Sequence, residues 1–291
     1  MRTVSVALTA FAAALALTAS ASGSASSSAL TGACAKEKLA LKTPGTLTIG
    51  TDNPAYPPWF DGGETKGEKW KINDPAKGKG FESAVAYAVA KQLGFTGLEV
   101  HWVVVPFNNS FKPGKKSFDF FINQVSYLPE RAKNVDFSAS YYDVNQAIVA
   151  VKGKPAASAK SIAALKKFKL GAQIGTTSYQ YIVKNIKPSS SPSVYDSNND
   201  AVTALKNGQI DGLVVDLPTA FYVTAVQVEN GVIVGQFPSV GGQERFGLVL
   251  GKGSPLTVCV NKALAALKAN GTLKRLQQQW LSKATGAPVL K

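Results

Sequence analysis

The chain has 291 residues, of which 45% are hydrophobic, so it is long enough for one large or two medium-sized domains with a sizeable core. It carries 32 Lys and Arg against 18 Asp and Glu, a formal net charge of +14, which is typical of a solvated basic surface or of attraction to an anionic wall or membrane surface. A nucleic-acid partner is not expected, because the basic residues form no dense tract and no stripe with interleaved aromatics.

The first 21 residues have the features of a signal peptide. Arg2 supplies the positive end, residues 4–17 form a short apolar run, and Ala19-Ser20-Ala21 resembles an A-x-A cleavage site. The run is too short for a membrane span. We therefore expect export, with cleavage near Ala21, to the periplasm, the cell surface or the extracellular space. Residues 22–44 are then a Ser/Ala/Gly-rich tether and N-terminal segment.

The chain contains two cysteines, Cys34 and Cys259. In an oxidising compartment an even pair favours a single disulfide. The alternative is that Cys34 is a lipid-anchor cysteine. The residues before it only half match a lipobox, because Leu30 stands one place too early. The disulfide is the favoured interpretation, and without a lipid the mature protein is expected to be soluble.

The first half of the chain is predicted to contain four strands and one helix, with an aromatic-rich loop after the first strand. Residues 46–51 predict a short strand, and three prolines in the segment 52–59 exclude a regular element there. Apolar spacing over residues 81–93 predicts a helix that Gly94 ends. Further strands are predicted over 98–105, 118–125 and 142–151, the last long enough to cross between domains.

The second half repeats the alternation of strands and helices. Helices are predicted over 161–167, 198–207, 256–269 and 272–282, and strands over 170–174, 210–215, 231–234 and 247–251. Asn270-Gly271 separates the last two helices, as a C-cap does. This alternation is typical of an α/β protein whose mainly parallel sheets are covered on their faces.

Two of the predicted strands share a sequence pattern. Residues 118–124 and 210–216 each have an apolar residue, an Asp, an apolar run, and a polar side chain five places after that Asp. The polar side chains, Gln124 and Asp216, would stand at the carboxyl edge of a sheet, where open α/β sheets bind ligands. Two such edges facing each other would form a site between two lobes. Chance similarity of two buried strands is the alternative.

Three segments carry groups that suit a zwitterionic amino acid. Arg131 follows a buried-looking strand, and its planar fork suits a carboxylate. Residues 175–177, Gly-Thr-Thr before a helix, offer N–H donors at a positive helix end. Asp216 can hold an ammonium. Each has an alternative: a surface ion pair for Arg131, a helix cap for residues 175–177, and an N-cap for Asp216.

Other polar and aromatic side chains complete the candidate site. Gln124 and Ser126 are placed to add hydrogen bonds, and an acid, Asp52 or Glu82, to meet a polar or cationic tip. Three aromatic residues are candidates for the pocket wall, with a place in the core as the alternative. The candidate ligand-binding set is Asp52, Tyr56, Trp59, Phe107, Gln124, Ser126, Arg131, Thr177 and Asp216. No metal-ligand cluster is recognised in the sequence, and neither a metal nor a cofactor is expected.

The block Pro129-Glu130-Arg131-Ala132, followed by Val135-Asp136-Phe137-Ser138 and the Tyr141-Tyr142 pair, resembles a signature of the solute-binding proteins, family 3, that feed polar amino acids to ABC importers. Shorter matches occur in the same order along residues 45–285. They are Gly50-Thr51-Asp52, Tyr56-Pro57-Pro58, Gly80-Phe81-Glu82, Pro106-Phe107, Gly175-Thr176-Thr177 and the pair Asp211 and Asp216.

The resemblance implies a periplasmic-binding-protein-like fold of type II, with two lobes and a two-strand hinge. Lobe 1 would comprise residues 45–146 plus 246–291, and lobe 2 residues 147–245. In the family, the residues matching Arg131 and Thr177 hold the ligand α-carboxylate and the residue matching Asp216 holds the α-ammonium. Those matching Tyr56 and Phe107 flank the ligand side chain. The partners implied are an amino acid and an ABC permease in the membrane, and the protein is expected to be a monomer.

Four residues depart from the family pattern: Glu82 for Asp, Gln124 for a small residue, Leu128 for Thr, and Trp59 for Phe. They bear on which amino acid binds, and with the basic surface they favour a neutral or polar one. One alternative is an exported enzyme on the same fold, a dehydratase or peptidoglycan lyase, with Glu82 as its candidate catalytic carboxylate. The only histidine, His101, lies in a predicted strand and reads as structural. Another alternative is a wall-binding module that uses the basic surface.

Overall fold

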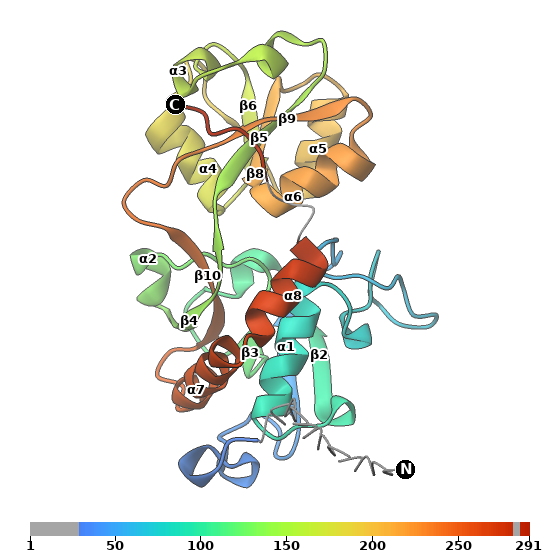
Figure 1. Cartoon of the computed structure of the whole chain (residues 1–291), viewed down its shortest axis with the longest axis vertical. Helices are drawn as coiled ribbons and strands as arrows, with labels where there is room; N and C mark the ends of the chain where they lie inside the picture. The colour runs from blue at the N-terminus through green and yellow to red at the C-terminus, as the bar shows by residue number, and fades with distance from the viewer. Residues whose placement is uncertain (1–28, 282–285) are drawn as a thin grey trace, which may run out of the picture.

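The computed structural model describes residues 29–281 and 286–291, which form two α/β lobes (Figure 1). The expected signal peptide, 1–21, lies outside the described residues, as do residues 22–28 of the expected tether. Each lobe is built on a five-stranded sheet, ordered β2-β1-β3-β10-β4 in the first lobe and β7-β6-β8-β5-β9 in the second. The expected fold class, a type II periplasmic-binding-protein-like architecture, matches this arrangement.

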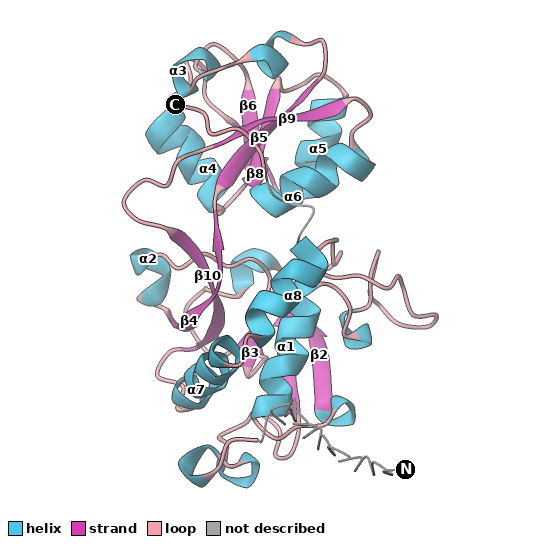
Figure 2. Cartoon of the chain, viewed as in Figure 1, coloured by secondary structure: helices cyan, strands magenta, loops and turns pink. Residues whose placement is uncertain are grey.

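In the first lobe the strands are β1 (Leu47–Thr51), β2 (Val100–Val104), β3 (Phe120–Phe121), β4 (Val135–Val144) and β10 (Glu244–Gly251). Its helices are α1 (Phe81–Gln92), α2 (Pro129–Ala132), α7 (Leu256–Ala269) and α8 (Thr272–Leu281). The second lobe has the strands β5 (Gln146–Val151), β6 (Leu170–Gln173), β7 (Ser193–Tyr195), β8 (Gly212–Asp216) and β9 (Gly231–Gln236). Its helices are α3 (Ile162–Leu165), α4 (Thr177–Tyr181), α5 (Asn198–Lys206) and α6 (Leu217–Tyr222). Figure 2 shows the helices packed around both sheets.

Both sheets are mixed and mainly parallel, because in each of them four strands run in one direction and one runs against them. Strands β1, β2 and β3 run parallel, as do β6, β7 and β8. Strand β10 is antiparallel to β3 and β4, and β5 is antiparallel to β8 and β9. The antiparallel strands belong to the two chain crossings between the lobes, β4 to β5 and β9 to β10, so they enter each sheet from the opposite end (Figure 1).

The strand predicted over residues 142–151 is in fact two strands that belong to different sheets. Strand β4 ends at Val144 and β5 begins at Gln146. Strand β4 also starts earlier than predicted, at Val135, because the segment from Val135 pairs with β10. The strand predicted over 118–125 shortens to two residues. Gln124 has φ of 48°, a left-handed conformation that an extended strand does not contain.

The C-terminal residues lie with the second lobe, whereas the sequence-based boundary had placed 246–291 in the first. Val289 forms a parallel bridge with Gln236 next to β9, and the Ile162 N–H donates to the Lys291 carbonyl at 2.9 Å. Leu290 is buried in the second-lobe core. The chain thus passes between the lobes a third time, between Leu281 and residue 286.

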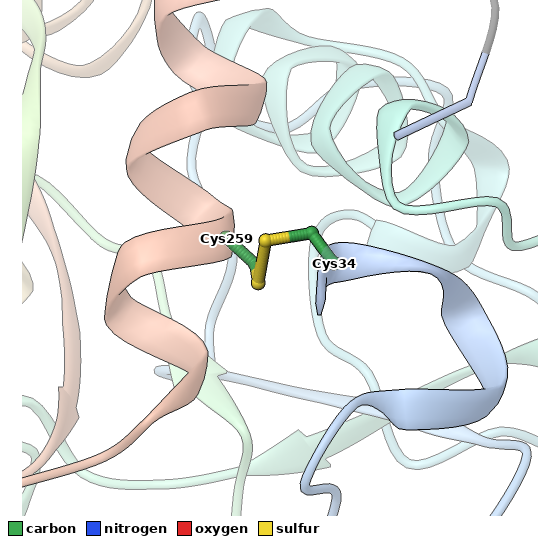
Figure 3. The surroundings of a disulfide bond; sticks show 2 residues. All are labelled: Cys34 and Cys259. Atoms are coloured by element: carbon green, nitrogen blue, oxygen red, sulfur yellow. A yellow bond between two sulfur atoms is a disulfide. The ribbon is translucent and has the colours of Figure 1, made fainter. Parts of the chain in front are cut away.

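A disulfide joins Cys34 to Cys259, as the sequence had favoured (Figure 3). Cys259 lies on α7, Cys34 lies in a short 3-10 turn, and both belong to the first-lobe core. The bond therefore ties the N-terminal segment to the first lobe and makes no link to the second. A lipid anchor at Cys34 would need the same sulfur.

Candidate functional site

A small cavity of about 50 Å³ lies between the lobes, where the carboxyl ends of their strands meet. It brings together side chains of both lobes, including a guanidinium and a carboxylate. Its lining consists of Phe107, Asn123, Gln124, Ser126, Arg131, Gln146, Gln173, Thr176, Thr177, Ser178, Asn198, Val215, Asp216 and Phe246. A wider groove of about 730 Å³ near the hinge contains neither Arg131 nor Asp216. The small cavity is therefore the candidate site.

Arg131 is a buried cation at this cavity. Its side chain is 6% exposed, and its guanidinium carbon lies 4.3 Å from the centre of the Phe111 ring. It donates to the Ser126 carbonyl at 2.7 Å and, across the lobes, to the Gly175 carbonyl at 2.6 Å. Burial lowers the pKa of Arg131 to about 10, while nearby Glu244 and Glu130 act in the opposite direction. Within the described residues it has no carboxylate within 4 Å.

Asp216 provides the opposite charge from the second lobe. It ends β8 and is also the N-cap of α6, accepting from the Thr219 N–H at 3.0 Å and the Thr219 hydroxyl at 2.9 Å. Burial raises the pKa of Asp216 to about 6, against these hydrogen bonds, and the charge of Glu244 adds to the rise. The N-cap role and a place at the cavity are thus both present.

Glu244 joins the hydroxyls of the two lobes. Its carboxylate accepts from Ser126 Oγ at 2.5 Å, from Thr177 Oγ1 at 2.6 Å and from Gln146 Nε2 at 3.1 Å. Gln146, on the other crossing strand, accepts from Ser178 Oγ at 2.6 Å. Thr177 opens α4 after the N-cap Thr176, so its N–H lies in the first turn of the helix, where it has no helical acceptor.

Gln124 lies between the cavity and a buried carboxylate, Glu82. The Gln124 N–H donates to Glu82 Oε1 at 2.7 Å, and its side-chain amide donates to Oε2. The Tyr141 hydroxyl also donates to Glu82. Burial raises the pKa of Glu82 to about 7, although these hydrogen bonds oppose the rise. Glu82 does not line the cavity.

Three of the candidate residues lie away from the cavity. Asp52 accepts from the N–H groups of Asn53 and Phe107, so it fastens the loop that carries Phe107. Trp59 is buried in the first-lobe core, against Phe81, Tyr142 and Phe246. Tyr56 is half-buried, and neither it nor Trp59 lines the cavity. Both aromatics were expected in the wall of the ligand pocket. Trp59 lies in the first-lobe core instead, which was the alternative, and Tyr56 lies outside the cavity lining.

The other six candidates, Phe107, Gln124, Ser126, Arg131, Thr177 and Asp216, line the cavity together. Five polar residues at or beside the cavity were not predicted from the sequence: Glu244, Gln146, Asn123, Gln173 and Asn198. Gln146 and Glu244 could have been predicted from their position, because each is a polar residue beside a predicted crossing and such residues lie at the edge of both lobes. Asn123 directly precedes Gln124, and Gln173 precedes the Gly-Thr-Thr segment.

Comparison with known proteins agrees with this geometry. Residues 47–283 match the model of the bacterial extracellular solute-binding proteins, family 3. The ABC transporter arginine-binding protein 1 of Escherichia coli K12 is 30% identical over 207 residues, covering 69% of this chain and 81% of that protein. The L-cystine-binding protein TcyJ of the same strain is 29% identical over 263 residues, 86% of each chain.

Solved structures share the fold. The crystal structure of the ancestral amino acid-binding protein AncCDT-1, a precursor of cyclohexadienyl dehydratase, superposes with a TM-score of 0.66. It is 30% identical, and the match covers 81% of this chain and 95% of that one. The family match spans most of the chain and includes the residues around the cavity. The chain therefore belongs to the bacterial extracellular solute-binding proteins, family 3.

Proposed function

We propose that this protein captures a neutral or polar L-amino acid between its two lobes and delivers it to an ABC permease. The observation that carries the proposal is the pairing of Arg131 and Asp216 at one cavity. Arg131 is a buried guanidinium without a carboxylate partner among the described residues, and Asp216 faces the same space from the other lobe. An α-carboxylate and an α-ammonium complement these two groups.

The rest of the lining supports a ligand with an uncharged, hydrogen-bonding side chain. Five carboxamides reach the cavity: Asn123, Gln124, Gln146, Gln173 and Asn198. A carboxamide both donates and accepts hydrogen bonds, so it can bind a polar side chain that carries no charge. The carboxylate of Glu244 already accepts hydrogen bonds from Ser126, Thr177 and Gln146, which leaves it less available to a cationic tip.

Ligand entry requires the lobes to separate. The cavity of about 50 Å³ is well below the roughly 300–1,000 Å³ of typical ligand pockets. We propose that residues 45–144 and 244–281 move as one lobe, and that residues 146–243 move with residues 286–291 as the other. Rotation about the crossing strands then opens and closes the site.

The same proposal covers the setting of the protein. We propose an exported monomer that acts in the periplasm or at the cell surface and binds its ligand without chemical change. Relatives named for arginine and cystine binding support a transport role. No helix within residues 29–281 or 286–291 is both long and apolar enough to cross a membrane. Glu82, the candidate catalytic carboxylate, lies behind Gln124 rather than at the cavity.

The test is a thermal-shift screen of the mature protein, from residue 22, against the common L-amino acids and L-cystine, followed by calorimetry on each hit. A ligand present at a thousandfold excess over Kd stabilises the folded protein by about 4 kcal/mol. We expect hits among the neutral and polar amino acids, with the ligand unchanged by NMR after hours of incubation. A screen without hits contradicts the proposal, and consumption of the ligand supports an enzyme.

A further inference from the structure

The indole of Trp59 connects the two lobes directly. Its ring is 1% exposed and is held by edge contacts with Tyr142 and Phe246 in the first-lobe core. Its Nε1 donates to Thr219 Oγ1 of the second lobe at 3.0 Å, and this hydrogen bond is buried. The two residues are 160 positions apart in the chain. The packing that fixes the ring therefore also fixes the direction of its N–H.

The contact forms part of a wider junction between the lobes. Thr219 lies in the first turn of α6, and Phe221 on the same helix packs against the first-lobe core. Helix α6 thus contacts the first lobe through one polar and one apolar side chain. This junction lies apart from the cavity, since neither Trp59 nor Thr219 belongs to its lining.

The Thr219 hydroxyl connects the hydrogen bond from Trp59 to Asp216, which lines the cavity. An indole N–H can only donate, so Thr219 Oγ1 is the acceptor, and its own proton remains free to be donated. That proton goes to Asp216 Oδ2 at 2.9 Å, while the Thr219 N–H donates to Oδ1 at 3.0 Å. Both carboxylate oxygens of Asp216 are therefore held by Thr219, whose hydroxyl is oriented by Trp59.

We infer that Trp59 is a positioning residue that holds the lobes together in the arrangement seen here and orients Asp216 toward the cavity through Thr219. A Phe at this position would fill the same part of the core but would lack the N–H. The role assigned to Asp216 rests on the proposed function, whereas the link between the lobes does not.

The experiment measures the lobe arrangement first, without any amino acid. Spin labels are attached to Lys91→Cys on α1 and Lys206→Cys on α5, both exposed, one on each lobe. Distance distributions from pulsed electron resonance are compared for the parent, Trp59→Phe, Thr219→Val and the double variant. Thr219→Ser, which keeps the hydroxyl, is the matched control. Calorimetry with L-glutamine, L-cystine and L-arginine as probes is run in parallel.

We expect Trp59→Phe and Thr219→Val each to shift the ratio of short to long distances by two- to tenfold, which is about 0.4–1.4 kcal/mol and matches one buried hydrogen bond. The double variant should shift it no further, and Thr219→Ser should resemble the parent. Any probe that binds should lose affinity in both variants, and more in Thr219→Val, which also removes the hydrogen bond to Asp216 Oδ2. Unchanged distributions in both single variants, or additive shifts in the double variant, overturn the inference. If no amino acid in the thermal-shift screen binds, the proposed function fails, while the distances still decide the role of Trp59.

Discussion

The substitution Arg131→Met separates the contribution of Arg131 to binding from its contribution to folding. Methionine keeps much of the length and the apolar contact with Phe111 but removes the charge and all donors. Loss of one partner of a buried, hydrogen-bonded charge pair costs about 2–5 kcal/mol of binding. We therefore expect Kd for the amino acid to rise by about 30- to 5,000-fold.

The effect on stability should be small, because two opposing contributions nearly cancel. The variant loses the hydrogen bonds to the Ser126 and Gly175 carbonyls, at about 1.5–3 kcal/mol each. It also no longer buries a cation that lacks a carboxylate partner among the described residues, a desolvation cost of several kcal/mol. We expect a change within about 2 kcal/mol, which moves the melting temperature by less than about 8 °C for a protein of this size.

The assay is calorimetric titration combined with thermal unfolding, and Arg245→Met is the matched control. Arg245 is an exposed arginine that also stacks on an aromatic ring, Tyr127, but does not line the cavity. Its replacement should leave Kd within twofold. Binding by Arg131→Met that stays within threefold of the parent would refute the carboxylate role, and a much larger fall in melting temperature would show that Arg131 is chiefly structural.

Three further predictions concern groups around the cavity and in the core. Glu244→Gln should lower stability by about 1–3 kcal/mol in urea unfolding, because hydrogen bonds from Ser126, Thr177 and Gln146 lose their charged acceptor; unchanged stability would show that these bonds contribute little. The pKa of Glu82 rises on folding from 4.5 to about 7, so the folded state binds more protons in that window and the free energy of unfolding falls as pH increases through it. In Glu82→Gln the fall in unfolding free energy with pH should be smaller, as urea unfolding at several pH values can measure. The same pH dependence as in the parent would contradict the raised pKa of Glu82. Joint replacement of Cys34 and Cys259 by serine opens a link across 225 positions and should cost about 2–5 kcal/mol of stability with ligand affinity unchanged; a loss of affinity would mean that the disulfide also shapes the site.

The sequence predicted the elements best where local signals agreed. The span of α7 was predicted residue for residue, because its apolar spacing runs up to the Asn270-Gly271 stop. Strand β7 was missed, since its three residues at the sheet edge carry only a weak apolar pattern. The crossing between the lobes was expected within the strand 142–151, but the break at Asn145 that divides this strand in two was missed. Residues on either side of it continue the same β-rich pattern, and only tertiary pairing assigns them to different sheets.

The same distinction holds for the site. Arg131, Thr177 and Asp216 were predicted to lie together because each stands at the end of a strand or the start of a helix, and the topology places all three at one cavity. The direction of a side chain in an irregular loop has no comparable periodicity. The loop around Tyr56 and Trp59 was placed at the correct edge, but the sequence did not show that Trp59 points into the core. Glu244 contacts residues 67 to 118 positions away, so no local pattern reveals its role.

The third passage of the chain between the lobes would restrict the lobe motion proposed above. Helix α8 ends at Leu281 in the first lobe, and residues 286–291 pair beside β9 in the second. Five peptide units join the two ends, and a fully extended chain spans at most about 3.6 Å per residue, or roughly 18 Å in total. While Leu290 stays in the second-lobe core, Leu281 and residue 286 can move apart by no more than this length. Gly286 lies beside the crossing residues Val144, Asn145 and Gln236, so this third link adds a restraint to the proposed hinge itself.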